Sequence, residues 1–552
     1  MSGTSHLGAL DQGTSGTRFV IFDESGTPIS EAFTGHQPQT AGAGRIEYDP
    51  LRLWGCATDA IRRGLAGADL DAAELRALGI SSQRQTVLLW DAESGRPCTS
   101  ALSWRDRRTT AQIQALDDEE RRLIRDRTGL EPDAYFAAPK IKWLLDEGGD
   151  GAQKAGRGEQ EAGRSGERAG PNGQKSGRSE RRADRDRGAD ADEGAAGHDD
   201  GRRDADLRER AARGEVLLGT VDSWLCYNLT GRHVTDVTNA AQTMLFDIRG
   251  REWDDDLLAL FDVPRPALPT VRPSSDPEGF GVTDPDGVLN AAVPVTGVMG
   301  DQQAALLGRV ACTESNAKVT YGTGNFFLQN TGTEPVEADG ELLTTIWFQR
   351  AGEDPYYGLE GPVFATGAVL EWLRTVGLLE DAAELDQPGC TEREEAVHFV
   401  PAFGGLGAPD WVPGARGGVF GLHRDTDRDD VLRAAVEAIG FGTRAVVEAA
   451  EAATGVAQDR LLVDGGAIQN DEFAQCQADL IDRPLVRSNV TQTTALGACF
   501  AAGLAAGVWG SLDDLEPCRP NGRTFSPTGD SAAVTDAYRR WRDVVETVAR
   551  MS

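Results

Sequence analysis

The segment 7–23, LGALDQGTSGTRFVIFD, carries the side chains best suited to phosphate chemistry. A hydrophilic turn joins two apolar runs, with Gly13 and Gly16 inside the turn and Asp11 and Arg18 at its ends. Successive backbone N–H groups in such a turn can form an anion-binding nest, and glycine lets a ligand approach the main chain. The turn alone fits an ordinary hairpin, but the flanking Asp and Arg favour a phosphate loop. Because the turn lacks the P-loop pattern, a different nucleotide-binding fold is predicted.

A second polar group follows an apolar strand predicted at 293–299, in the order Gly300-Asp301-Gln302-Gln303. An Asp after Gly at a strand end can project into a cleft and accept a proton from a hydroxyl group. The same Asp can instead cap the small-residue helix that follows it. The residues alone leave both interpretations open.

The second half of the chain repeats the opening pattern. Residues 318–328 indicate a strand, a Gly-Thr-Gly turn around Thr323 and another strand, and residues 461–467 indicate a strand ending in Asp-Gly-Gly. Elsewhere, 74–80 is predicted as the end of a helix, 87–91 and 101–104 as strands, and 219–231 as a turn and helix. Two halves that each open with a Gly/Thr hairpin predict duplicated α/β domains around a central cleft, where ligands commonly bind.

Length and composition narrow the class of protein. A chain of 552 residues is too long for one core, so two or more domains are expected. The apolar runs are too short to cross a bilayer, and no secretory signal pattern begins the chain. The eight cysteines are scattered, without a CxxC pair. We therefore expect a protein of the reducing cytoplasm without membrane insertion.

The charge balance is strongly acidic. The net charge is -32, and lysine supplies very little of the positive charge because it occurs only at the five positions 140, 142, 154, 175 and 318. A nucleic-acid partner is not expected, because no basic run appears outside one mixed-charge segment. An acidic, lysine-poor chain suggests adaptation to a salt-rich cytoplasm, where ions screen self-repulsion. A merely acidic bacterial enzyme is the alternative.

Residues 146–206 differ from the rest of the chain. The segment contains no Val, Ile, Leu, Met, Phe, Tyr or Trp and mixes both charge signs. Such a composition cannot bury enough apolar surface to offset the entropy of ordering, so disorder is expected. Because the sequence on both sides resembles one continuous domain, the segment is predicted to be a charged insertion in the first domain.

Ten stretches in order along the chain resemble the glycerol kinases of the FGGY carbohydrate kinase family, across all of it outside 146–206. They are DQGTSGTRFVIFD, SSQRQTVLLWD, SWRDRRT, GTVDSWL, TNAAQTMLFDI, GDQQAALLG, TYGTG, VPAFGGLGAPDW, ARGGVFGL and VDGGAIQND. The resemblance implies an α/β fold of two actin/hexokinase-type (ribonuclease H-like) domains around a central cleft. Residues 7–309 would form the polyol-binding N-terminal domain and 315–550 the nucleotide-binding C-terminal domain.

The same resemblance implies phosphoryl transfer from ATP to glycerol, giving glycerol 3-phosphate, with Mg²⁺ as the metal. Asp301 would be the general base, and Asp11 would reach the metal through water. The implied substrate-binding residues are Arg84, Gln85, Trp104, Tyr135, Asp301, Gln302 and Phe326. The implied nucleotide-binding residues are Thr14, Ser15, Gly16, Arg18, Thr323, Gly367, Glu371, Gly466 and Asn470. Family members are often dimers or tetramers, so a homo-oligomer is also implied.

Five positions depart from the family pattern, and the first concerns the substrate. Gln85 stands where glycerol kinases usually carry Glu, so Arg84 is expected to find its counter-charge in Asp301. The other departures are Gly16 for Ser, Arg105 for Gln, Ala137 for Ser or Thr, and Glu371 for Gln. They leave two alternatives open: a family kinase for another polyol or a ketose such as xylulose, and a non-catalytic nucleotide-binding protein.

Overall fold

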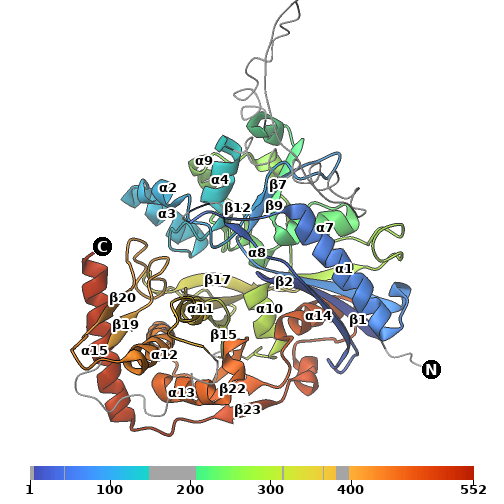
Figure 1. The fold of residues 1–552 in the computed structure, drawn as a ribbon. Coiled ribbons are helices and arrows are strands. Elements are labelled where there is room, and N and C mark those ends of the chain that lie inside the picture. The colour runs from blue at the N-terminus through green and yellow to red at the C-terminus, as the bar shows by residue number, and fades with distance from the viewer. Residues whose placement is uncertain are drawn as a thin grey trace, which may run out of the picture.

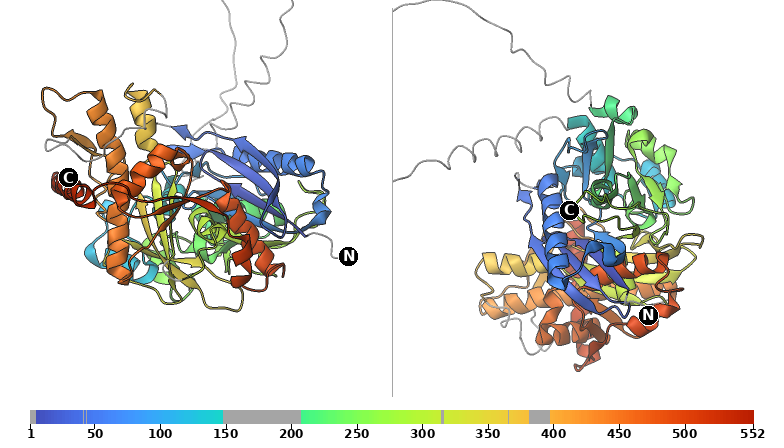
Figure 2. Two further views of the ribbon diagram at one scale, coloured as in Figure 1. Left: turned by 90° about the horizontal axis from the view of Figure 1, so that it is seen from below. Right: turned by 90° about the vertical axis from the view of Figure 1, so that its right-hand side faces the viewer.

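The computed structural model describes residues 5–40, 42, 44–147, 207–313, 316–364, 366–380 and 397–552. Within these residues the chain forms two mixed sheets, a smaller antiparallel sheet and covering helices (Figure 1). The cyan and green segments occupy the upper part of Figure 1 and most of the orange and red segments the lower part, with the dark blue N-terminal strands between them. The two chain ends lie on opposite sides in the left view of Figure 2.

The first mixed sheet has the strand order β14-β6-β1-β2-β3. In the β1–β2 hairpin Asp11 pairs with Arg18, whereas β6 and β14 run parallel to β1. The carboxyl ends of these parallel strands therefore share one edge, where Asp11, Arg84 and Asp301 come together. The strands are β1 (His6–Gln12), β2 (Gly16–Phe22), β3 (Pro28–Gly35), β6 (Leu75–Ser82) and β14 (Val295–Gly300).

The second mixed sheet has the order β17-β18-β16-β15-β21-β22-β23. Its β18-β16-β15-β21-β22 portion repeats the order and the strand directions of the first sheet. This is the duplication that the two Gly/Thr hairpins predicted. The strands are β15 (Ala317–Tyr321), β16 (Asn325–Gly332), β17 (Leu343–Phe348), β18 (Tyr356–Val363), β21 (Leu461–Asp464), β22 (Leu485–Ser488) and β23 (Gly522–Phe525).

Two helices of small residues, α10 (Asp301–Gly308) and α14 (Thr493–Ala505), pack together where the halves meet. A Cβ atom on Gly308 would lie 1.9 Å from the Thr493 carbonyl oxygen, and one on Gly497 would lie 1.8 Å from that of Ala304. Only glycine allows so close an approach of the two backbones. Because α14 also covers β1, β6 and β14, a helix from the C-terminal half rests on the N-terminal sheet. The domain limits 7–309 and 315–550 stay predictions.

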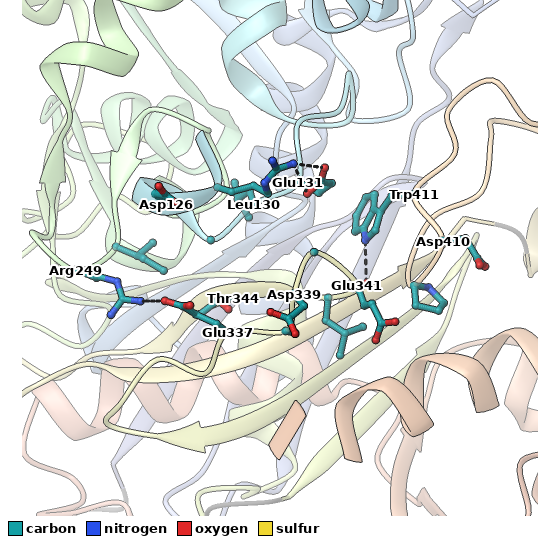
Figure 3. A pocket seen from close by; sticks show the side chains of 17 residues that line it. Asp126, Leu130, Glu131, Arg249, Glu337, Asp339, Glu341, Thr344, Asp410 and Trp411 are labelled. Carbon is teal, nitrogen blue, oxygen red and sulfur yellow. Dashed lines mark hydrogen bonds and ion pairs between the residues drawn. The ribbon is translucent and has the colours of Figure 1, made fainter. Parts of the chain in front are cut away.

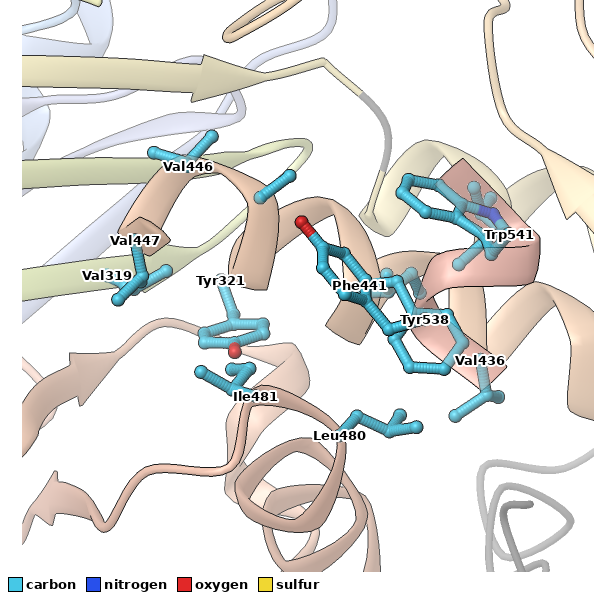
Figure 4. Packing of buried hydrophobic residues seen from close by; sticks show 14 of the residues in the cluster. Val319, Tyr321, Val436, Phe441, Val446, Val447, Leu480, Ile481, Tyr538 and Trp541 are labelled. Carbon is cyan, nitrogen blue, oxygen red and sulfur yellow. The ribbon is translucent and has the colours of Figure 1, made fainter. Parts of the chain in front are cut away.

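The core of the second sheet is closed by α12 (Arg428–Thr454), α13 (Asp471–Ile481) and α15 (Ser531–Arg550). Tyr321 of β15 lies among aliphatic side chains from α12 and α13, and Phe441 of α12 faces Tyr538 and Trp541 of α15 (Figure 4). This apolar packing fixes the end of β15, and with it the second hairpin turn.

The antiparallel sheet has the order β4-β5-β8-β7-β9 and carries the remaining walls of the site. Its strands are β4 (Gln39–Thr40), β5 (Ile46–Tyr48), β7 (Val87–Asp91), β8 (Ala101–Leu102) and β9 (Val216–Thr220), and α4 (Ala137–Glu147) and α7 (Val221–Thr230) pack nearby. Further elements are α1 (Pro50–Ala68), α2 (Thr110–Gln114), α3 (Asp118–Thr128), β10 (Val234–Asp236), α8 (Val237–Ala240), β11 (Phe246–Asp247), β12 (Glu252–Trp253), α9 (Asp255–Leu260), β13 (Thr270–Arg272), α11 (Gly367–Thr375), β19 (His398–Val400) and β20 (Gly418–Phe420).

Several boundaries differ from the sequence predictions; the strand predicted at 101–104, for example, ends at Leu102. The predicted helix end at 74–80 is mostly strand, because β6 begins at Leu75 and its buried positions continue the sheet. The predicted insertion begins two residues early, since Asp146 belongs to α4 and pairs with Lys142 at 3.3 Å and with Arg208. The rest of that segment, 148–206, lies outside the described residues. Within the described chain, no helix combines the length and apolar character needed to span a membrane.

Candidate active site

A cavity of about 270 Å³ lies where the two mixed sheets meet. Both hairpin turns line it, the first through Gly13 to Ser15 and the second through Gly322 and Thr323. The structure thus brings together all seven residues implied for the substrate and three of those implied for the nucleotide. The full lining is Asp11, Gly13, Thr14, Ser15, Arg84, Gln85, Trp104, Tyr135, Asp301, Gln302, Thr320, Gly322, Thr323, Phe326 and Thr494.

Asp301 is the first residue of α10, directly after β14. Its carboxylate accepts the Gln302 backbone N–H at 2.8 Å and lies 3.4 Å from Arg84 Nε. Its side chain is 27% exposed toward the cavity, so a ligand can reach it. Burial raises the pKa of Asp301, while Arg84 and Lys318 oppose that rise. A carboxylate with a raised pKa next to a cavity is suited to accept a proton.

Arg84 finds its main counter-charge in Glu360 of β18, which the sequence analysis missed. The guanidinium makes a two-pronged bond, with Nη2 2.5 Å from Glu360 Oε1 and Nη1 2.6 Å from Oε2. The Arg84 and Glu360 side chains are 2% and 0% exposed. The expected partner Asp301 also pairs with Arg84, but at 3.4 Å it is the more distant of the two carboxylates. No local signal pointed to Glu360, because its strand belongs to the other half of the molecule.

Gln85 has a backbone φ of +59°, a conformation uncommon for residues other than glycine. This backbone turn lies between β6 and β7 and places the side chain at the cavity wall. The Gln85 amide nitrogen donates to Gln242 Oε1 at 2.6 Å. Gln242 donates in turn to Glu360 Oε2 at 3.2 Å and to Thr345 Oγ1 at 3.1 Å.

Three aromatic rings form one wall. The Trp104 ring meets Tyr135 and Phe326 edge to face, at centroid distances of 5.8 and 5.9 Å. Trp104 Nε1 donates to Thr14 Oγ1 at 3.1 Å, which ties this wall to the first hairpin turn. The loop that carries Tyr135 is held by the buried Lys140, whose ammonium donates to the carbonyl oxygens of residues 134, 135 and 136. Burial lowers the pKa of Lys140 to about 7.

Lys318 of β15 is a second residue that the sequence analysis did not assign. Its buried ammonium donates to Gln302 Oε1 and, at 2.6 Å, to Thr320 Oγ1. Thr320 donates to Asp464 at 2.6 Å, so β15, β21 and α10 are joined under the cavity. Burial lowers the pKa of Lys318 to about 8, and Asp464 and Asp301 oppose that shift. The rarity of lysine in this chain was the available signal.

Asp11 accepts a hydrogen bond from Ser81 at 2.9 Å, and its pKa is raised to about 6, chiefly by burial and further by Asp301. No group of three metal-ligating side chains occurs among the described residues. The single carboxylate of Asp11 still suits Mg²⁺, because protein sites hold Mg²⁺ through one or two carboxylates together with waters and substrate phosphates.

The remaining implied residues of the first hairpin lie outside the cavity lining. Arg18 pairs with Glu31 at 3.0 Å and lies over the Phe33 ring. Gly16 packs against that same ring: an added Cβ atom would lie 2.2 Å from it. The departure from Ser at position 16 thus has a steric reason in Phe33.

Among the implied nucleotide residues of the C-terminal half, Thr323 lines the cavity and the other four do not. The Gly367 N–H donates to the Gly322 carbonyl oxygen at 3.0 Å, which fixes the start of α11 against the turn. Gly466 follows β21, and Asn470 caps α13 by accepting the Phe473 N–H at 2.8 Å. Glu371 is exposed on α11.

A larger cavity of about 640 Å³ lies elsewhere, between α3 and the loops 337–344 and 409–411 (Figure 3). Its charged side chains are paired in part, Arg125 with Glu131 and Arg249 with Glu337, and Trp411 Nε1 donates to the Glu341 carbonyl oxygen. None of the residues implied for substrate or nucleotide lines it.

Comparisons with known proteins agree with this geometry. Residues 6–157 and 203–308 match the N-terminal domain, and 317–506 the C-terminal domain, of the FGGY family of carbohydrate kinases. The chain is 45% identical to a glycerol kinase of Halobacterium salinarum, over 98% of both chains, and 44% identical to one of Haloferax volcanii, over 99% of this chain and 98% of the relative. A crystal structure of Plasmodium falciparum glycerol kinase with ADP matches with a TM-score of 0.78 at 26% identity, over 99% of this chain and 98% of that one.

Proposed function

Because the chain belongs to the FGGY family of carbohydrate kinases, we propose that it transfers the terminal phosphoryl group of ATP to a hydroxyl group of glycerol, giving glycerol 3-phosphate. One observation carries the proposal. The carboxylate of Asp301, the hydrogen-bonding side chains Arg84 and Gln85, and both Gly-rich turns line the same small cavity. The names of the relatives described above, all glycerol kinases, support the choice of polyol.

The substrate would lie with its hydroxyl groups toward Arg84, Gln85, Asp301 and Gln302 and its C–H faces against the aromatic wall. Asp301 would accept the proton of the attacking hydroxyl. Its position at the N-terminus of α10 favours the charged carboxylate, and its raised pKa makes the carboxylate a better base. The cavity is slightly smaller than the usual sites for drug-sized ligands, which suits a small hydroxylated substrate.

The phosphate groups would lie between the two hairpin turns, near Thr14, Ser15 and Thr323, with Gly16 shaping the first turn. The buried ammonium group of Lys318 on β15 would add positive charge near these phosphate groups. Asp11 would hold Mg²⁺ through water, and the metal would neutralise charge on the transferred phosphoryl group. Arg18 would reach the phosphates only after leaving Glu31. The rest of the nucleotide would contact four residues of the C-terminal half: Gly367, Glu371, Gly466 and Asn470.

A kinase for another polyol or a ketose such as xylulose is the second candidate, and Gln85 is the observation that favours it. Structures of xylulose kinases resemble this chain at 22% identity and below, so they bear on the fold alone. Both Asp11 and Asp301 line the same cavity, and the presence of these two carboxylates argues against a non-catalytic nucleotide-binding protein.

A coupled assay of ADP release over glycerol, erythritol, xylulose and gluconate tests the proposal. We expect the highest kcat/KM with glycerol. Asp301→Asn should keep ATP binding and lose turnover by about 100- to 10,000-fold, the usual contribution of a general base. The matched control is Asp286→Asn, at an exposed position of the same half. A preference for another substrate, or near-parental turnover by Asp301→Asn, would refute the assignment.

A further inference from the structure

Gln85 stands beside the substrate-binding arginine without the negative charge that the family usually places there. A glutamine can present either an oxygen or an N–H₂ group, which differ in what they bind. A polyol hydroxyl group can donate to the oxygen. The orientation of this one amide therefore decides whether the cavity offers an acceptor at that point, and the side chains behind Gln85 determine that orientation.

The orientation of the Gln85 amide depends first on Glu360, which is fully buried. Its two oxygens receive both prongs of the Arg84 guanidinium, and Arg84 remains charged. A carboxylate in such a pair only accepts hydrogen bonds. The Gln242 group that faces Glu360 Oε2 at 3.2 Å must therefore be the N–H₂ group.

The orientation of the Gln242 amide in turn fixes the orientation of the Gln85 amide. With its nitrogen between Glu360 and Thr345, its oxygen faces the other way, toward the Gln85 amide at 2.6 Å. Two amide oxygens at that distance would repel each other, so Gln85 must present its nitrogen to Gln242. The Gln85 oxygen is then left on the opposite side of the amide, and within the described part of the chain no hydrogen bond reaches it.

We propose that Gln242 and Glu360 are positioning residues that hold the Gln85 amide with its oxygen toward the polyol cavity, so that a neutral glutamine serves as a hydroxyl acceptor. The inference rests on the proposed function. It also sets the expectation for Gln85→Glu. A carboxylate at position 85 would face the Gln242 oxygen and would add a second negative charge near Glu360, so the substitution should weaken glycerol binding.

A compensating substitution follows from counting donors and charges. In the Gln85→Glu variant, position 242 faces three acceptors: the new carboxylate at position 85, Glu360 and Thr345. A lysine supplies three donors and one positive charge. The double substitution Gln85→Glu with Gln242→Lys therefore keeps the local charge unchanged, whereas each single substitution changes it by one.

The test is a double-mutant cycle at saturating ATP, with glycerol KM, kcat, ATP KM and melting temperature measured for each protein. We expect each single variant to raise the glycerol KM by about tenfold or more, since loss of one buried hydrogen bond is comparable to 1.4 kcal/mol. The double variant should return to within about threefold of the parent, a coupling that independent sites do not show. The ATP KM should change by less than about twofold, because the hydrogen bonds of Gln85 and Gln242 within the described chain go to neither hairpin turn.

Two further variants keep the test decisive if Gln242→Lys folds poorly. Gln242→Met has similar volume and no hydrogen bonds, and should raise the glycerol KM at nearly unchanged kcat. Thr345→Val removes only the second acceptor, so Glu360 still orients Gln242 and the KM should change by less than about threefold. Additive effects in the double variant, a parental KM in Gln85→Glu, or a parental KM in Gln242→Met would overturn the inference. Absence of glycerol turnover by the parent would instead overturn the proposed function.

Discussion

At the scale of single residues, the site depends on charges that are balanced across the two halves of the molecule. Arg84 comes from the first half and Glu360 from the second. Lys318, also from the second half, faces Asp301 from the first, and each shifts the pKa of the other. The proton acceptor is therefore tuned by residues distant in the sequence.

Lys318→Met should move the acidic limb of the pH–rate profile to higher pH. The charged groups around Asp301 are Arg84, Lys318, Glu360 and Asp11, and loss of the Lys318 charge removes support for the carboxylate. The pKa of Asp301, already raised by burial, should then rise further. Because the base must be ionised, turnover should be lost at a higher pH as the pH falls.

The measurement is kcat against pH at saturating glycerol, ATP and Mg²⁺. Lys142→Met serves as the control, since Lys142 lies on α4 and pairs with Asp146. An acidic limb that stays in place in Lys318→Met would show that Lys318 does not act on the base.

At the scale of elements, turns and helix starts are fixed by close backbone contacts. The second hairpin turn bonds to the start of α11 through the N–H groups of residues 366, 367 and 368. A Cβ atom on Gly367 would lie 2.7 Å from the Gly322 carbonyl oxygen. The turn therefore depends on a glycine that lies on a different element, far along the sequence.

Gly367→Ala should displace the second hairpin turn and weaken nucleotide binding. We expect the ATP KM to rise by about tenfold, the equivalent of 1.4 kcal/mol, with a smaller change in glycerol KM. Steady-state kinetics with each substrate varied in turn would show this split. Gly55→Ala is the matched control, because a Cβ atom at that helical position meets nothing within 4 Å. Equal effects of both substitutions on the ATP KM would contradict the role of Gly367.

For the molecule as a whole, the two halves are joined by helix packing as well as by the site. The flanks of the predicted insertion are also joined, because Arg208 pairs with Asp146 and, at 2.6 Å, with Asp262. These contacts hold the flanking residues to the first half of the molecule without any residue of 148–206.

Deletion of residues 150–204 should leave activity and melting temperature nearly unchanged. The segment has no large apolar residue to add to a core, and the cost of loop closure changes slowly with loop length. Thermal unfolding and glycerol kinetics of the deleted chain would show this, with a scrambled segment of equal composition as control. Limited trypsin digestion of the parent should cut there first. Loss of folding on deletion, or resistance of the segment to trypsin, would contradict the prediction.

Added KCl should raise the melting temperature, because the net charge of -32 makes the folded chain repel itself. Between about 0.1 M and about 1 M salt the Debye length falls from ~10 Å to ~3 Å, so repulsion among the excess carboxylates is screened. The relatives from halophilic archaea fit this expectation. Calorimetry at several KCl concentrations, with sucrose of equal osmolality as control, tests it. A melting temperature that is constant or falls in KCl would favour a merely acidic enzyme.

Local signals in the amino-acid sequence predicted the two Gly-rich turns and the duplicated α/β fold, and the resemblance to the FGGY family implied most of the cavity lining. Gly-rich turns, apolar strand periods and the Gly300-Asp301 junction are each readable within a few residues. The start of β6 was misjudged because strand and helix signals are ambiguous in short apolar runs.

The pairing of charges and amides in the site became visible only in the folded chain. The partners in these pairs are separated along the chain: Glu360 lies 276 residues from Arg84, Gln242 lies 157 residues from Gln85, and Lys318 lies 16 residues from Gln302. Hydrogen bonding and burial at such separations leave no local pattern in the sequence. The ion pair of Arg18 with Glu31 on the neighbouring strand likewise became visible only in the folded chain, and the role of Arg18 at the nucleotide stays a prediction. Which group balances a buried charge is set by the packing of strands from both halves, and that packing exists only after folding.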